Sequence, residues 1–101
     1  MIYITQLIYI SQGQENIFHQ FEDIAIPLIS KYNGNLLLRI RPDAGSFIEN
    51  SIDQPYEVHL VTFHSQEDFD NFKLDEERKK FLHLKEKSIT ASILIQGTKI
   101  S

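Results

Sequence analysis

The sequence predicts an α+β fold of the ferredoxin-like type, with elements in the order βαββαβ and one four-stranded antiparallel sheet. Four stretches rich in β-branched and aromatic residues predict the strands, and two segments with helical spacing of apolar residues separate the first strand from the second and the third from the fourth. A chain of 101 residues is the size of one domain, so we expect residues 1–101 to form a single unit.

The first half of the chain carries a strand, a helix and a second strand. Residues 2–10 are mostly β-branched or aromatic and predict the first strand. Between residues 15 and 32 the apolar side chains recur at intervals of three and four, which predicts one buried face of a helix. Pro27 should bend this helix because proline has no backbone N–H. Gly34 should end it in the left-handed conformation, and residues 35–41 predict the second strand.

The second half of the chain opens with a long connection. Residues 42–55 are more apolar than a plain loop needs, so we expect either a short strand extension there or a segment folded over another part of the molecule. Residues 56–63 predict the third strand, and Ser65 caps a second helix. Asp75 begins a further helical turn, and residues 89–96 predict the fourth strand.

Both faces of the predicted sheet are apolar. The second strand contains three consecutive leucines, and in the third strand the neighbours Leu60 and Val61 must point to opposite faces. Two helices cover only one face of such a sheet, so the other face needs a partner. A second copy of the chain is the simplest partner, and we therefore expect a homodimer through the sheet face, as in a dimeric α+β barrel.

The composition excludes several classes of function. The chain has no cysteine, which removes disulfides, thiolate metal sites and cysteine nucleophiles, and its four histidines lack a supporting acidic cluster, so we expect no metal ligands. A net charge of −4 without a basic stripe argues against nucleic acid, and no phosphate-binding loop or other cofactor motif is present. No apolar run approaches the roughly 20 residues that span a membrane, and the apolar beginning lacks the basic residues of a signal peptide. We expect a cytoplasmic protein without a cofactor, a nucleic-acid partner or a membrane partner.

Four segments of the chain carry more specific patterns: Ala25-x-Pro27-x-Ile29, Tyr32-Asn33-Gly34, Leu36-Leu37-Leu38-Arg39, and Thr62-Phe63-His64-Ser65 followed by Phe69 and Phe72. Together they resemble a small bacterial family of unknown function in the dimeric α+β barrel superfamily. The chain departs from that family's pattern at Asn33, Thr62, His64 and Arg39-Ile40-Arg41. The resemblance implies a dimeric ferredoxin-like fold, shared by cofactor-independent monooxygenases, isomerases and proteins without known activity.

Arg39 and His59 are the candidate catalytic residues. The second and third strands should be hairpin partners, so the two side chains should lie close together, and strand parity should turn His59 toward the helices. His59 would act there as a general base or hydrogen-bond donor, while Arg39, which matches an arginine of the resembling family, would bind a carboxylate or stabilise an enolate. The alternative is structural: His59 is hydrogen-bonded within the sheet, and Arg39 pairs with Glu57 or with an acidic residue of a second subunit.

Tyr3, Thr5 and Tyr9 are the candidate ligand-binding residues, because their hydroxyl groups would orient a small aromatic or keto ligand. The alternative is that they only satisfy local polar groups. We expect a pocket between sheet and helices that binds a small organic molecule, in a cofactor-independent enzyme of the monooxygenase or isomerase type. The competing hypothesis is a non-catalytic binding or interaction protein whose sheet serves dimerisation. Convergence of Arg39 and His59 on one cavity would distinguish the two.

Overall fold

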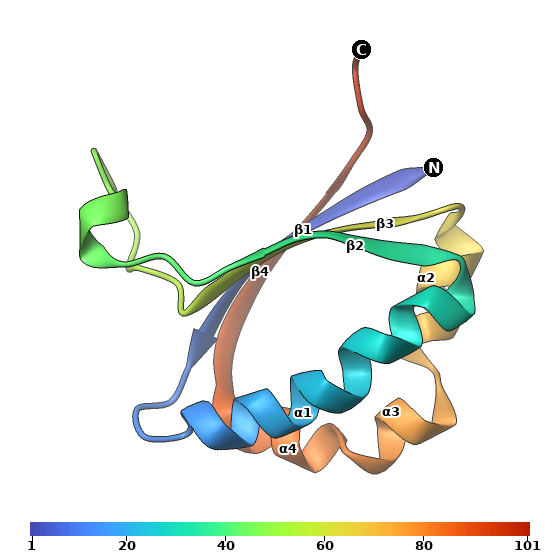
Figure 1. Cartoon of the computed structure of the whole chain (residues 1–101), viewed down its shortest axis with the longest axis horizontal. Coiled ribbons are helices and arrows are strands. Elements are labelled where there is room, and N and C mark those ends of the chain that lie inside the picture. The colour runs from blue at the N-terminus through green and yellow to red at the C-terminus, as the bar shows by residue number, and fades with distance from the viewer.

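The structure, a computed structural model, describes all 101 residues and places the helices against one face of a single sheet (Figure 1). The strands are β1 (Ile2–Ile10), β2 (Gly34–Ile40), β3 (Glu57–Phe63) and β4 (Ile89–Gly97). The helices are α1 (Glu15–Leu28), α2 (Gln66–Lys73), α3 (Glu76–Lys80) and α4 (Leu82–Ser88), with short 3-10 turns η1 (Ile29–Tyr32) and η2 (Ala44–Ser46). The strand order is β2-β3-β1-β4 and every pair is antiparallel, which confirms the predicted α+β, ferredoxin-like arrangement. None of these helices is long and apolar enough to cross a membrane.

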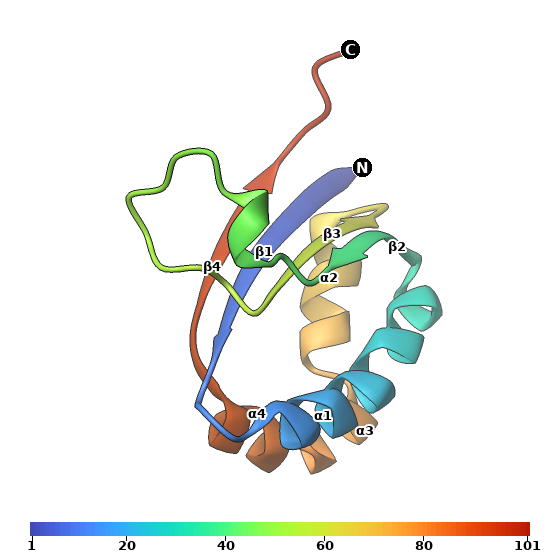
Figure 2. The same cartoon turned by 60° about the vertical axis from the view of Figure 1, so that its left-hand side comes forward.

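The register between β1 and β3 decides which side chains face the helices. Ile4 lies opposite Val61, and Ile8 lies opposite Glu57, and all four are buried. Because successive residues of a strand point to opposite faces, the alternate residues of β1 and β3 lie on the face that no helix covers. Figure 2 shows this open face on the side of the sheet away from α1, α3 and α4.

The core lies between the sheet and the helices. Ile4, Val61 and Phe63 of the sheet form a buried cluster with Ile29 and Phe69. The ring of Phe63 packs on Phe69 at a centroid distance of 5.3 Å. From α1, Ile26 packs against this cluster, and the three-and-four spacing of the helix buries Phe18, Phe21 and Ala25 on the same side.

The junction between α1 and β2 differs from the expectation in two respects. Pro27 lies in the last turn of α1, and the chain then tightens into η1 rather than bending within one long helix. Asn33, and not Gly34, takes the left-handed conformation with φ 57°, which asparagine tolerates better than most residues. Gly34 begins β2, where an added Cβ would lie 2.6 Å from side-chain atoms of both Ile29 and Phe63. The glycine is therefore needed for close packing and not for its φ angle.

The connection between β2 and β3 forms no strand extension, and its residues 51–53 lie beside the sheet, next to Tyr9, Ala91 and Ile93. Asp43 and Ser46 cap the short turn η2 reciprocally, and Ile48 beyond it is 98% exposed. The segment returns to the sheet at Asp53, whose carbonyl oxygen accepts a hydrogen bond of 2.7 Å from the Tyr9 hydroxyl. Ile48 thus remains in solvent, whereas Ile52 is half exposed and lies beside β4.

Gly34→Ala should destabilise the fold by about 1–3 kcal/mol, because its methyl group would overlap Ile29 and Phe63 in the core. The free energy of unfolding from urea titration measures the effect. Gly97→Ala is the matched control, since a Cβ there meets no atom within 4 Å. Equal stability of the two variants would contradict the close approach at Gly34.

Candidate ligand-binding cavity

A cavity of about 150 Å³ lies between the sheet and the helices. Of the 18 residues that line it, 11 are hydrophobic, and they include Ile4, Phe21, Ala25, Val61 and Leu94. Apolar cavities of this size in other proteins hold a molecule as large as benzene. The cavity therefore has room for the body of a small organic molecule.

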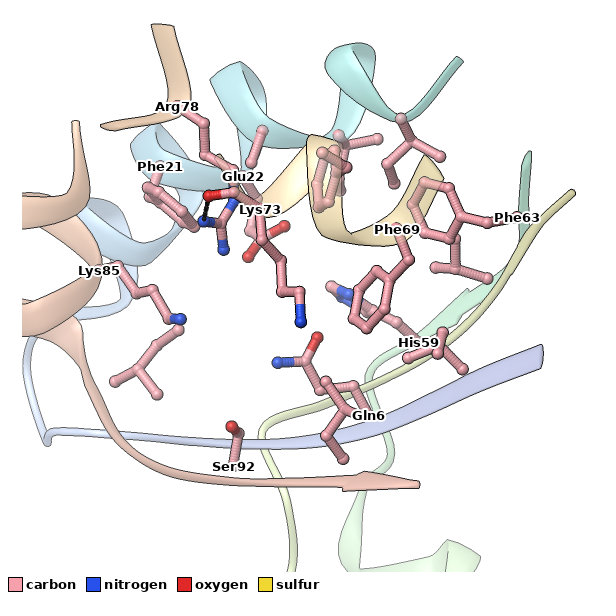
Figure 3. A pocket seen from close by; sticks show the side chains of 18 residues that line it. Gln6, Phe21, Glu22, His59, Phe63, Phe69, Lys73, Arg78, Lys85 and Ser92 are labelled. Carbon is pink, nitrogen blue, oxygen red and sulfur yellow. Dashed lines mark hydrogen bonds between the residues drawn. The ribbon is translucent and has the colours of Figure 1, made fainter. Parts of the chain in front are cut away.

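Polar and charged side chains are set into this apolar wall (Figure 3): Gln6 and Ser92 from β1 and β4, His59 from β3, Glu22 from α1, Lys73 from α2, Arg78 from α3 and Lys85 from α4. Figure 3 shows the ends of the three cationic side chains turned toward the same space as Gln6. A few convergent polar groups in an apolar hollow are typical of small-molecule sites.

Glu22 is the most unusual group in the cavity. It lies in the apolar stripe of α1, four residues after Phe18 and three before Ala25, so the helix turns it inward. Only 7% of Glu22 is exposed, and its carboxyl group makes no hydrogen bond to the chain. Burial raises the pKa of Glu22 to about 7, and the nearby cations, Arg39 first among them, lower it only in part. The group can therefore gain or lose a proton near neutral pH.

His59 faces the same cavity and is oriented by Glu57. Burial alone would raise the pKa of Glu57, but hydrogen bonds from Arg39, His59 and Arg41 outweigh burial and hold that pKa at about 2. Burial lowers the pKa of His59, so its imidazole is neutral at neutral pH. The ionised carboxylate can only accept, so we assign the hydrogen of the 2.8 Å contact to Nε2 of His59. Nδ1 then carries a lone pair, and it makes no hydrogen bond within the chain.

The structure brings Arg39 and His59 together, as their pairing across β2 and β3 predicts, but only His59 lines the cavity. The guanidinium group of Arg39 is held by Glu57, with 2.7 Å between Nε and Oε1. Arg41 donates to the other oxygen of the same carboxylate. Arg39 thus has the structural partner that the sequence offered as the alternative, and it is not placed to touch a molecule in the cavity.

Tyr3, Thr5 and Tyr9 do not line this cavity, contrary to the expected pocket role. They alternate along β1 with Ile4 and Ile8, which face the helices, so their side chains lie on the open face of the sheet. Tyr9 instead borders a shallow depression on that face. The polar residue through which β1 reaches the cavity is Gln6, opposite His59.

Sequence reasoning missed all four charged residues of the cavity, Glu22, Lys73, Arg78 and Lys85. Glu22 had a usable signal, because it continues the three-and-four spacing of apolar residues from Phe18 to Ala25. Arg78 and Lys85 had none, because they stand among many charged residues in the segment 65–87. No three His, Asp or Glu side chains come together in the manner of a metal site.

Asp75 fixes the position of α3 and therefore of Arg78. Its buried side chain accepts hydrogen bonds from the backbone N–H of Arg78 at 2.9 Å, from Lys31 at 3.1 Å and from the Tyr32 hydroxyl. The hydrogen bond from Tyr32, together with that backbone N–H and Lys31, holds the pKa of Asp75 well below its usual range. An ionised Asp75 thus ties α3 to η1 and presents Arg78 to the cavity.

Glu57→Gln should destabilise the fold at neutral pH by about 3 kcal/mol, because it leaves Arg39 and Arg41 without their carboxylate and disturbs His59. The folded pKa of about 2 lies below the ordinary value of 4.5, so the carboxylate stabilises above pH 4.5 and this contribution disappears as the pH falls toward 2. Urea titrations at several pH values should show the difference between the variant and the wild type shrinking in acid. Glu49→Gln, in the exposed connection, is the control. A difference that is constant with pH would contradict the assigned role of Glu57.

Comparisons with known proteins show where this fold recurs. No protein-family model and no curated protein matches the chain. Among solved structures, a protein of unknown function from Rhodopseudomonas palustris is similar, with a TM-score of 0.83 at 11% identity over 99% of this chain and 82% of that one. An uncharacterised NIPSNAP domain protein from Burkholderia xenovorans has a TM-score of 0.74 at 10% identity over 100% and 96%. A NIPSNAP family protein of unknown function from Agrobacterium tumefaciens has a TM-score of 0.68 at 18% identity over 100% and 91%. At such identities, these similarities establish the fold of the chain, one that it shares with bacterial proteins of unknown function.

Proposed function

We propose that the chain binds a small, largely apolar organic molecule in the cavity between the sheet and the helices. The observation that carries this proposal is the carboxyl group of Glu22, which an otherwise buried side chain presents to the cavity and which accepts no hydrogen bond from the chain. A few polar groups that face an apolar hollow are typical of ligand sites, and an ionisable group with a strongly shifted pKa is typical of functional ones. A bound molecule with a polar group would supply the missing partner for Glu22, while its apolar body would occupy the rest of the cavity.

A catalytic version of this proposal is a proton transfer that needs no cofactor. Glu22 titrates near neutral pH, and His59 offers an unprotonated Nδ1, so both can take a proton from a bound molecule. Arg39 has no role in this version, because Glu57 holds its guanidinium group. The second candidate function is binding without catalysis, in which the same side chains only form hydrogen bonds with the bound molecule.

Acetophenone, which has a benzene-sized body and one carbonyl group, should bind in the cavity. In NMR titration the shifts should change for residues that line the cavity, such as Gln6 and Val61. Leu94→Trp should abolish binding, because Leu94 lines the cavity and is half exposed at its open side. The catalytic version adds that the wild type accelerates hydrogen–deuterium exchange at the ketone's methyl group in D₂O and that His59→Ala removes this acceleration.

Leu74→Trp is the matched control for this experiment, since Leu74 is also exposed but does not line the cavity. It should bind acetophenone as the wild type does. Shift changes confined to the open face of the sheet would contradict the proposal. Binding without any acceleration of exchange would leave a binding protein and exclude the proton transfer for this ketone.

We further propose that the chain forms a homodimer through the open face of its sheet. Four large apolar side chains of this face are about half exposed. They are Leu38 (45%) and Ile40 (44%) of β2 and Ile93 (41%) and Ile95 (55%) of β4. With Leu7 and Leu60 between them, these side chains form an apolar surface across all four strands. Apolar patches of this kind on a small protein mark interaction surfaces, and a twofold partner would cover the patch with an identical one.

Ile93→Glu should convert the dimer into a monomer, because the twofold axis brings the new charges of both copies into an apolar interface. Sedimentation equilibrium at micromolar concentration should give twice the mass of one chain for the wild type and a single mass for the variant. Ile48→Glu is the control, since Ile48 is fully exposed on the connection and outside the sheet. A wild type that sediments as a monomer would refute the homodimer.

A further inference from the structure

Arg78 carries a charge that the chain does not pair. Its Nε is buried without a hydrogen-bond acceptor, and its Nη1 donates only to the backbone carbonyl of Lys73 at 3.3 Å. The guanidinium group lies against the rings of Phe21 and Phe72, 5.7 and 5.2 Å from their centroids. No carboxylate forms an ion pair with it. A cation that is partly removed from water without an anion is unfavourable unless something else neutralises it.

Lys85 is the second unpaired cation of the cavity. It approaches from α4, and its ammonium group forms no ion pair and no hydrogen bond within the chain. Burial is the main cause that lowers the pKa of both Lys85 and Arg78. Glu22 raises both pKa values only in part, and it forms an ion pair with neither cation. Lys73 differs, since its ammonium group pairs with Asp70 at 3.4 Å and lies over the ring of Phe69. Two of the three cations around the cavity thus have no counter-ion in contact.

We infer that the molecule bound in the cavity is a small organic anion, a carboxylate with an apolar body, whose charged group lies against Arg78 and Lys85 while the carboxyl group of Glu22 takes up a proton. This inference rests on the proposed function and specifies the class of ligand. Glu22 is the only acid that lines the cavity, against three cations, so the cavity favours a negative charge. The planar guanidinium group suits a carboxylate, and the neighbouring apolar wall suits the body of the molecule.

Proton uptake follows from the charges that face Glu22. They come from four elements: Arg39 on β2, Glu57 on β3, Arg78 on α3 and Lys85 on α4. A bound carboxylate would offset Arg78 and Lys85, two of the three cations that favour ionised Glu22, and would add a like charge beside it. Both effects favour the protonated carboxyl group, which can then donate a hydrogen bond to the ligand. Binding of the anion and protonation of Glu22 should therefore be coupled.

Benzoate and its neutral isostere benzamide test the inference by isothermal titration calorimetry on the full chain. Benzoate should bind the wild type at least about tenfold more tightly than benzamide, the factor expected for a charge-assisted contact. Lys85→Met, which keeps the apolar stem, should reduce benzoate affinity about tenfold and leave benzamide affinity unchanged. Arg78→Lys keeps the charge beside Phe21 and Phe72 and should weaken benzoate by removing the planar donor.

Lys87→Met is the matched control, because Lys87 lies on the same helix, loses the same charge and does not line the cavity. It should leave both affinities unchanged. Equal affinity of the wild type for benzoate and benzamide would overturn the anion inference and support the proposed cavity binding. Failure of both probes, together with acetophenone, would overturn the proposed function itself.

The pH dependence gives a second readout that a merely structural role of Glu22 would not produce. Benzoate affinity should fall as the pH rises from about 6 to about 8, because ionised Glu22 repels the carboxylate. Glu22→Gln should remove this dependence and bind benzoate at the higher pH as tightly as the wild type does at the lower one. A wild-type affinity that does not change with pH would overturn the coupling to Glu22.

Discussion

The pairing register of β1 with β3 is the constraint on which the rest of the structure depends. It places Ile4, Ile8 and Val61 under the helices, together with Gln6, His59 and Glu57. A slip of one residue would exchange the two faces of either strand and expose these groups to solvent. The same register leaves Tyr3, Thr5 and Tyr9 on the open face. The register of this one strand pair therefore separates the core and the cavity from the surface proposed for dimerisation.

Two buried glutamates, Glu22 and Glu57, have very different pKa values because their surroundings differ. Glu57 is almost fully buried and yet ionised far below neutral pH, because three side chains donate hydrogen bonds to it. Glu22 is buried to a similar degree without any such donor, and its pKa rises to about 7. The difference makes Glu57 a fixed structural anion that orients His59. Glu22 instead remains able to exchange a proton with the ligand proposed for the cavity.

The two faces of the sheet differ in what surrounds them. The face under the helices combines a small core with a cavity whose cations exceed its acids. The open face is apolar across all four strands and contributes no charged side chain to the cavity. A chain of 101 residues has only two layers with which to bury a core, so a partner on the open face would add buried surface without altering the cavity.

Local signals in the sequence were sufficient for the four strands, for α1 and α2 and for their order, but α4 was not predicted as a separate helix. Strand composition, the helical spacing from Phe18 to Ile29, and the capping residues Ser65 and Asp75 act within a few residues of where they stand, and the structure agrees with each. Parity along β3 also placed His59 on the helix side. The sequence left open which alternate residues of β1 face the helices, and for that reason its hydroxyl groups were expected at a cavity that they do not line. It likewise left open whether Arg39 serves a ligand or Glu57. Only the tertiary structure brought Glu22, Arg78 and Lys85 from three helices to one cavity, because a residue's burial and charged neighbours arise from contacts between segments that are distant in the chain.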